Sequence, residues 1–190
     1  SSLCYGQDKG YLSTSDSLLN LGETDLAIAY LKEGLKIHTD EKTQFESYSS
    51  LCAIYKQIGD YSLSLEYGHK SLPIAENYKF TNLELYGDVL YNMSVSKYRF
   101  GDMDSTFFYS KAALLQRERN LNPNHPKIVQ NINALGLFYR AVGDLTKYVN
   151  YQEKALDLAL TSDSLDYNSL IIAHHFVGNS YETINNLQLA

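Results

Sequence analysis

A Gly-Asp pair returns at a fixed step of 42 residues in this chain, at Gly59-Asp60, Gly101-Asp102 and Gly143-Asp144. The next step lands on Asn185-Asn186, and a Gly-Glu pair at Gly22 comes 37 residues before the first. Glycine takes the left-handed conformation that ends a helix, asparagine is the next best, and aspartate caps the start of the following helix. The recurrence therefore predicts five corners between antiparallel helices.

Residues 132–160 show what lies on either side of one corner. Before it, apolar residues recur at steps of three and four, the spacing of a helix face: Ile132, Leu135, Phe138, Tyr139 and Val142. After it, a second apolar stripe runs through Leu145, Tyr148, Val149, Ala155, Leu156, Leu158 and Ala159. Neither helix can bury its stripe alone, so the two are expected to pack on each other and on neighbouring helices.

Small residues also recur at fixed distances from the corners. Seven residues before the 42-step positions come the small residues Cys52, Ser94, Gly136 and Gly178, and twelve after the first four corners come Gly34, Ser71, Ala113 and Ala155. Four residues before the 42-step positions come Tyr55, Lys97, Tyr139 and Tyr181. Small residues at fixed places indicate helices that cross closely there.

This pattern resembles the tetratricopeptide repeat, best in LGLFYRAVGDLTKYVNYQEKAL and well in IYKQIGDYSLSLEYGHKSL. The usual repeat is about 34 residues. The longer step and the stretch NPNHPKIVQNINALG resemble the kinesin-light-chain-like subtype, which also occurs in bacterial multidomain proteins ahead of CHAT-type peptidase, sensor or regulator modules. The resemblance implies an all-α fold, an α-α superhelix of about four and a half hairpins.

The expected helices cover 8–21, 24–38, 41–58, 61–79, 82–100, 103–120, 128–142, 145–161 and 169–184. They form one solenoid domain over 1–190, with units at about 8–38, 41–79, 82–120, 124–161 and 165–190. Pro73 is expected to kink or shorten its helix, and Pro123 and Pro126 to keep their predecessors out of helix. The last unit is incomplete, so we expect a fragment of a longer chain.

The charge and hydrophobicity of the chain limit the kinds of partner that it can bind. The net charge of −6 disfavours a nucleic-acid-binding body, which needs clustered Lys and Arg. No apolar run is long enough to insert into a membrane. Cys52 is expected to be a buried free thiol. Localisation stays open: cytoplasmic or, if residues 1–7 are the remnant of a signal peptide, periplasmic or secreted.

No catalytic or cofactor motif is present. The chain lacks a Gly-rich phosphate loop, HExxH, GxSxG and CxxC. Adjacent His174 and His175 point about 100° apart on a helix, whereas a helical metal pair needs a spacing of four. We therefore predict no enzyme activity, no cofactor and no metal site.

What remains is a surface. In the resemblance, first helices line a concave groove that binds a peptide or a partner protein. Aligned on the corners, the groove residues are Ser49, Lys56, Gln57, Tyr91, Asn92, Tyr98, Arg99, Asn133, Leu137, Arg140, His175, Asn179 and Glu182. The lysine–asparagine clamp that some family members use for a C-terminal carboxylate is not reproduced. The predicted function is a non-catalytic protein-interaction scaffold, the sensor or regulatory part of a larger protein.

Two other interpretations stay open at this stage. The first is an intramolecular regulatory domain that docks on an adjoining catalytic domain of the same chain, such as a CHAT-type peptidase. The second is a small-molecule sensor, which would show an enclosed pocket with convergent polar groups.

Overall fold

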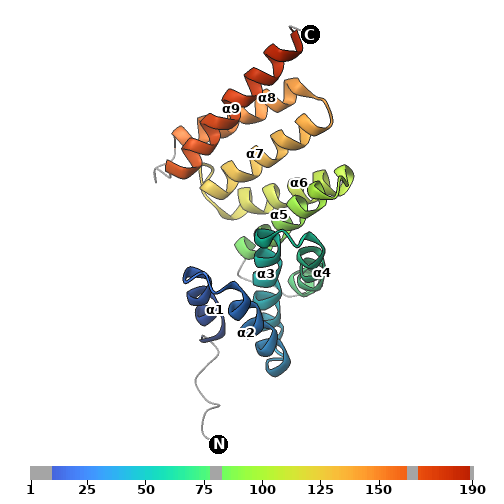
Figure 1. Ribbon diagram of the computed structural model, residues 1–190, viewed down its shortest axis with the longest axis vertical. Helices are drawn as coiled ribbons and strands as arrows, with labels where there is room; N and C mark the ends of the chain where they lie inside the picture. Colours follow the sequence, from blue (N-terminus) through green and yellow to red (C-terminus); the bar gives the residue numbers. More distant parts are fainter. Residues whose placement is uncertain (1–9, 78–82, 162–166, 189–190) are drawn as a thin grey trace, which may run out of the picture. The chain divides into compact units, whose positions relative to one another are not determined.

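A computed structural model of the chain describes residues 10–77, 83–161 and 167–188. All regular structure in these ranges is α-helical, and hairpins run along the chain from the blue to the red end of Figure 1. The helices are α1 (Gly10–Asn20), α2 (Thr24–Ile37), α3 (Glu41–Ile58), α4 (Tyr61–Asn77), α5 (Leu83–Arg99), α6 (Met103–Asn120), α7 (Pro126–Ala141), α8 (Leu145–Leu160) and α9 (Tyr167–Gln188). The all-α prediction is confirmed.

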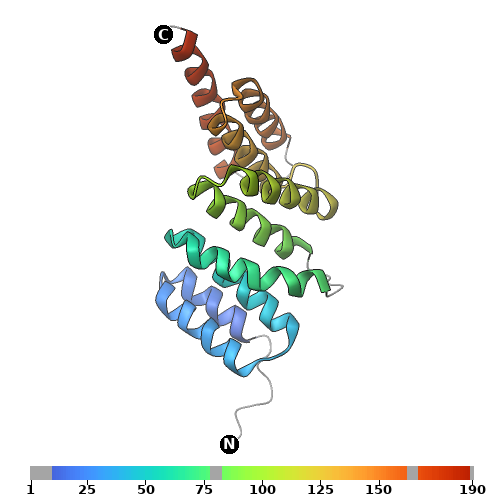
Figure 2. The same ribbon diagram turned by 90° about the vertical axis from the view of Figure 1, so that its right-hand side faces the viewer.

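The chain divides into two compact units, Ser1–Ser96 and Lys97–Ala190, and the division falls in the last turn of α5. In the first unit α1 packs on α2, α2 on α3, and α3 on α4. In the second unit α6 packs on α7, α7 on α8, and α9 on both α7 and α8. Figures 1 and 2 both show α3 beside α4 and α7 beside α8 as antiparallel pairs.

The corners have the predicted geometry. Among the described residues four glycines have a positive φ: Gly22, Gly59, Gly101 and Gly143. At Gly143 the N–H donates to the Arg140 carbonyl at 3.2 Å, and the next N–H, of Asp144, reaches back to Tyr139 at 2.9 Å. These two bonds satisfy carbonyls that the end of α7 would otherwise leave unpaired.

Aspartate then caps the next helix at three corners. Oδ1 of Asp60, Asp102 and Asp144 accepts from the N–H three residues on, at 3.0, 3.1 and 3.1 Å. Glu23, at the first corner, makes no such bond.

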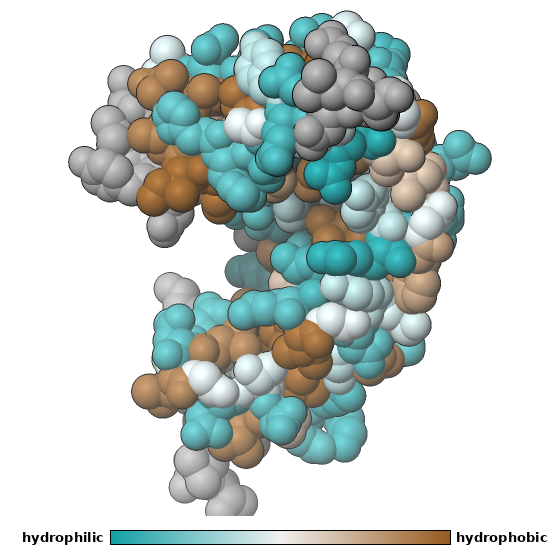
Figure 3. All heavy atoms as spheres, turned by 45° about the horizontal axis from the view of Figure 1, so that its top comes forward, coloured by the Kyte–Doolittle hydropathy of each residue, from teal (hydrophilic) through white to brown (hydrophobic). Residues whose placement is uncertain are grey.

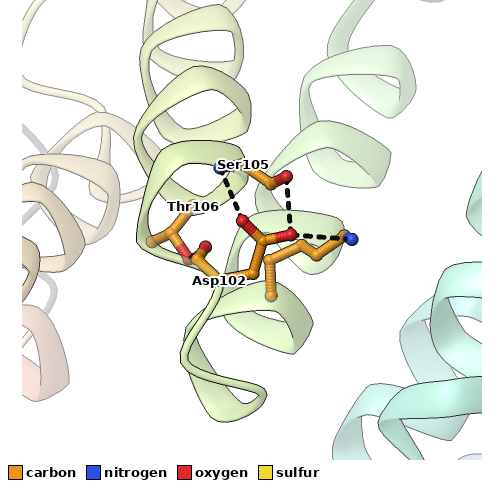
Figure 4. A network of polar contacts seen from close by, with 4 residues as sticks. Asp102, Ser105 and Thr106 are labelled. Carbon is orange, nitrogen blue, oxygen red and sulfur yellow. Dashed lines mark hydrogen bonds and ion pairs between the residues drawn. The ribbon is translucent and has the colours of Figure 1, made fainter.

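Asp102 does more than cap α6, as Figure 4 shows. Its Oδ2 accepts from the Ser105 hydroxyl at 2.8 Å and from Lys97 Nζ at 3.0 Å. The Ser105 hydroxyl, then Lys97, lower the pKa of Asp102 from 3.8 to about 2. Because the pKa is lowered, this contribution to stability is present above about pH 4 and is lost as the pH falls toward 2.

Several predicted helix ends differ from the structure by one to four residues. α7 begins at Pro126 rather than at 128, because proline suits the first helical position and His125 before it is extended. α4 runs past Pro73 to Asn77, so this proline does not end the helix, and the predicted end at 79 lies outside the described residues. α9 continues through Asn185 to Gln188, so the corner predicted there is wrong. Asparagine carries a Cβ that opposes the left-handed conformation, and no described non-glycine residue adopts a positive φ.

Most of the predicted small residues lie at close helix crossings. Ser71, Ala113 and Ala155 are fully buried, as are Cys52 and, but for a trace, Ser94. A Cβ on Gly136 would lie 2.2 Å from Nε2 of Gln152, which fills that space. Gly178 is the exception: it is exposed, and a Cβ there would meet nothing within 4 Å.

Serine hydroxyls line the seam between α3 and α4. The hydroxyls of Ser49 and Ser71 lie 2.9 Å apart, and Ser64 donates to the Cys52 carbonyl at 3.0 Å. Cys52 is a buried free thiol, as predicted, and burial raises its pKa to about 11. A thiol that holds its proton so firmly is not a nucleophile at neutral pH.

Candidate functional site

In the first unit, two first helices present residues of the predicted groove to each other. Lys56 Nζ, on α3, lies 5.9 Å from the centre of the Tyr91 ring on α5, a cation–π contact. Both side chains are partly exposed, and Gln57 beside Lys56 is exposed. The α3 and α5 faces that carry these residues therefore adjoin within this unit.

Two other groove residues of the first unit point inward. Ser49 is 2% exposed, and its hydroxyl donates to the Phe45 carbonyl at 2.6 Å while also contacting Ser71. Asn92 is buried as well. The Ser49 hydroxyl is therefore used within the seam between α3 and α4.

In the second unit the groove residues follow one register on two adjoining helices. Asn133, Leu137 and Arg140 stand at steps of four and three on α7, which places them on one face. His175, Asn179 and Glu182 repeat those steps on α9, and α7 contacts α9. Arg140, His175 and Glu182 are exposed, while Leu137 and Asn179 are partly exposed.

Asn133 differs from the others. It is 4% exposed, and its Oδ1 has no hydrogen-bond partner among the described residues. Its backbone carbonyl accepts from Gln152 Nε2 at 3.3 Å, so it is held by α8 through the main chain and not through its amide. An unsatisfied buried acceptor costs about 1–3 kcal/mol, so a donor from outside the chain would be stabilising.

The remaining predicted residues lie near the division between the units. Tyr98 is partly exposed and Arg99 exposed, in the last turn of α5. Figure 3 shows polar side chains, in teal, interspersed with apolar ones on the visible face, in keeping with a mixed surface.

Of the adjacent exposed residues His174 and His175, His175 takes part in a local contact. His175 Nε2 and Asn179 Nδ2 lie 2.9 Å apart, one turn along α9. His174 is exposed too. Among the described residues no group of three His, Cys, Asp or Glu side chains is placed to hold a metal ion. Within the described ranges no helix is both long and apolar enough to cross a bilayer.

Sequence reasoning missed one repeated residue. Eight residues after each of four corners stands a tyrosine: Tyr30, Tyr67, Tyr109 and Tyr151. Tyr67 stacks on Tyr55 with ring centres 5.5 Å apart, and Tyr151 packs on Tyr139 at 5.1 Å. The same alignment on the corners would have found this position, which in these two hairpins joins the helices close to the corner.

The fold matches solved structures of repeat proteins over nearly the whole chain. BtubC (BKLC) from P. vanneervenii is 18% identical, with a TM-score of 0.76, over 92% of this chain and 71% of that one. A putative kinesin light chain from Podospora anserina, with nearly identical TPR-like repeats, is 14% identical with a TM-score of 0.71, over 95% and 88%. This chain has the kinesin-light-chain-like tetratricopeptide fold.

A third structure, MamA from Desulfovibrio magneticus RS-1, is 18% identical with a TM-score of 0.60, over 94% of this chain and 95% of that one. No protein-family model and no curated protein matches the sequence. At these identities the likeness concerns the tetratricopeptide fold alone. Helical repeats of this kind generally serve as scaffolds for protein interaction, because their stacked helices expose long binding surfaces.

Proposed function

We propose that this protein is a non-catalytic scaffold that binds an extended peptide segment of a partner on its first-helix face, as the sensor or regulatory part of a larger protein. The observation that carries this proposal is the buried, unsatisfied side-chain oxygen of Asn133 in the same register as exposed Arg140.

The face on α7 offers three kinds of contact within two helical turns. The side-chain oxygen of Asn133 lacks a donor, and because that oxygen is buried a bound peptide supplies one through a bridging water. Leu137 is apolar and partly exposed. Arg140 is exposed, and its guanidinium lies 5.9 Å from the Tyr148 ring centre, which restrains it. An extended peptide with a carboxylate two or three residues from an apolar side chain would satisfy all three.

The neighbouring helix extends the same surface. Glu182 occupies on α9 the position that Arg140 occupies on α7. The face therefore carries opposite charges on adjoining helices, which favours a peptide with both signs of charge and fixes its direction.

The test is a peptide array that varies the position of Asp and Glu, followed by calorimetric titration of the best peptide. Arg140→Ala should weaken binding at least about tenfold, because a charge-assisted hydrogen bond contributes about 1.5–3 kcal/mol. Arg119→Ala is the matched control, since Arg119 is also exposed but lies on the second helix α6.

Asn133→Ala tests whether the peptide binds this face of α7, because it removes no charge from the protein. It should weaken binding of the same peptide while lowering stability little, because the side-chain amide has no bond to lose within the described residues. If the selected peptide binds the Arg140→Ala, Asn133→Ala and Arg99→Ala variants as tightly as the wild type, the proposed face is wrong.

A further inference from the structure

The outer face of α6 differs from that of the other second helices. The positions seven and fourteen residues after each corner are exposed, and in α2, α4 and α8 they hold small, polar or charged residues or proline: Ala29, Lys36, Glu66, Pro73, Asn150 and Asp157. In α6 they hold Phe108 and Leu115, which are 66% and 48% exposed. Two large apolar side chains thus lie two turns apart on the outside of a helix in the middle of the chain.

These two side chains point away from the rest of their hairpin stack. The residues that α6 buries lie on the opposite side of the helix: Thr106, Ser110, Ala113, Leu114 and Arg117. That buried side is the one through which α6 packs on α7. Single apolar residues on an outer face are common, whereas an apolar stripe along a helix is typical of a contact surface.

Opposite charges lie at the two ends of this stripe. Asp104 comes four residues before Phe108, and Arg119 four residues after Leu115. Steps of four, seven and four keep all four residues within about 60° around the helix axis. Asp104 and Arg119 are exposed, and neither forms an ion pair among the described residues.

The order acid, apolar, apolar, base is complementary to itself when it is reversed. In an antiparallel pair of α6 helices, Phe108 lies opposite Leu115 of the second copy, and Asp104 lies opposite its Arg119. Two-fold symmetry makes each of these contacts twice. Ala112, which is partly exposed, lies near the middle, where a small residue lets two helices approach. A parallel pair would instead place like charges against each other.

We propose that the outer face of α6, formed by Asp104, Phe108, Ala112, Leu115 and Arg119, binds the same face of a second copy of this chain in an antiparallel, two-fold symmetric dimer. The charges select the occupant, because this face matches its own reversed copy. One pair of helices buries less than the roughly 1,600 Å² of a standard interface, so the dimer is weak.

Lys111 lies at the edge of this face, and its two copies come close to the symmetry axis. Its Nζ lies 5.7 Å from the centre of the Phe107 ring on its own helix, a cation–π contact at the side of the stripe. Lys111→Ala should tighten the dimer, because two like charges leave the interface. A dimer that Lys111→Ala weakens contradicts the proposed pairing.

This surface is separate from the peptide face of the proposed function, because it lies on a second helix and points away from α7. The two proposals fail independently. Arg119→Ala should weaken the dimer and leave peptide binding unchanged, whereas Arg140→Ala should weaken peptide binding and leave the dimer unchanged.

The first test is sedimentation equilibrium of the 190-residue chain between about 1 µM and 1 mM. We expect monomers at the low end and dimers at the high end, with a dissociation constant of about 0.1 mM. Phe108→Asp should weaken association at least about tenfold, because it buries a charge at the centre of the interface. Leu26→Asp is the matched control, since Leu26 is 55% exposed on the second helix α2. Circular dichroism checks that both variants are folded.

Two outcomes of this test overturn the proposal. A chain that stays monomeric at about 1 mM leaves an adjoining domain as the occupant of the α6 face. A dimer that Phe108→Asp does not weaken, or that Leu26→Asp weakens as much, uses another surface.

Charge reversal tests the antiparallel pairing itself. Asp104→Arg gives a face with a base at both ends, and Arg119→Asp gives one with an acid at both ends. Each variant alone should associate at least about tenfold more weakly than the wild type, because like charges then meet twice. A mixture of the two should form a heterodimer about as tight as the wild-type dimer. If the mixture associates no better than the separate variants, the antiparallel pairing is wrong.

Discussion

The α3/α4 and α7/α8 hairpins share a corner and differ in the seam behind it. Gly59 and Gly143 have φ values of 86° and 82°, and the caps made by Asp60 and Asp144 are 3.0 and 3.1 Å long. Behind the corners, α3 and α4 meet through serine hydroxyls and a thiol, whereas α7 and α8 meet through Gly136 and Gln152.

The difference separates two kinds of information in the sequence. A corner needs two residues with particular backbone and capping properties, whatever their surroundings. A seam needs residues whose sizes complement each other across two helices, and small–small and glycine–glutamine pairs both meet that need. Seams can therefore diverge between repeats while corners stay the same.

The largest expected effect on stability comes from a substitution in the seam between α7 and α8. Gly136→Leu should lower the free energy of unfolding by about 2–3 kcal/mol, because a Cβ there already overlaps the buried Gln152 amide and crowds Tyr151. Urea denaturation followed by circular dichroism measures the loss. The double variant with Gln152→Ala should recover part of it, since the substitution opens the occupied space.

Gly178→Leu is the matched control, at the same register position on α9. It should raise stability by up to about 1 kcal/mol, because leucine is the better helix former and nothing lies within 4 Å of its Cβ. A similar loss at both positions would show that the Gly136 effect comes from the helix itself rather than from the crossing.

The fold could be predicted from the sequence because the residues that end and start its helices act locally and recur at a fixed step. Gly59, Gly101 and Gly143 each mark a corner without help from other residues, and α3 and α6 have the predicted bounds of 41–58 and 103–120. The corner at Asn185 was predicted wrongly because the 42-residue step outweighed the weaker preference of asparagine. That the chain forms a single domain remains a prediction.

The next effect is at the corners and should be the same in both hairpins. Gly59→Ala and Gly143→Ala should each lower the free energy of unfolding by about 1–2 kcal/mol. The surrounding space is open, but the Cβ of alanine is strained in the left-handed conformation. Urea titration of each variant gives the two values. The matching Asn substitutions should cost less, and a difference of more than about 1 kcal/mol between the two alanine variants would mean that the corners are not equivalent.

The residues of the candidate surface were harder to predict, because the exposure of a side chain depends on the helices packed beside it. Spacing placed Asn133 on the same face as Arg140, but only the structure shows that its oxygen is buried and lacks a partner among the described residues. Ser49 was placed on that face too, yet its hydroxyl is used by Phe45 and Ser71 in the seam. Which polar residue turns inward is decided by contacts with a neighbouring helix, such as that of Ser49 with Ser71, 22 residues away in the sequence.

The smallest expected effect is at the first corner, where the residue before the helix makes no side-chain cap bond. Glu23 precedes α2 as Asp60 precedes α4, but it makes no side-chain cap bond, because its carboxylate stands one methylene farther from the backbone. Glu23→Asp should raise stability by about 0.5–1 kcal/mol, with slower hydrogen exchange at the Leu26 amide, the donor that corresponds to Leu63 in α4. The reciprocal change, Asp144→Glu, should lose the bond to the Lys147 amide and a similar amount of stability. If Glu23→Asp leaves the Leu26 amide unprotected while Asp144→Glu weakens its corner, then the missing cap follows from the backbone at residue 23, and side-chain length is not its cause.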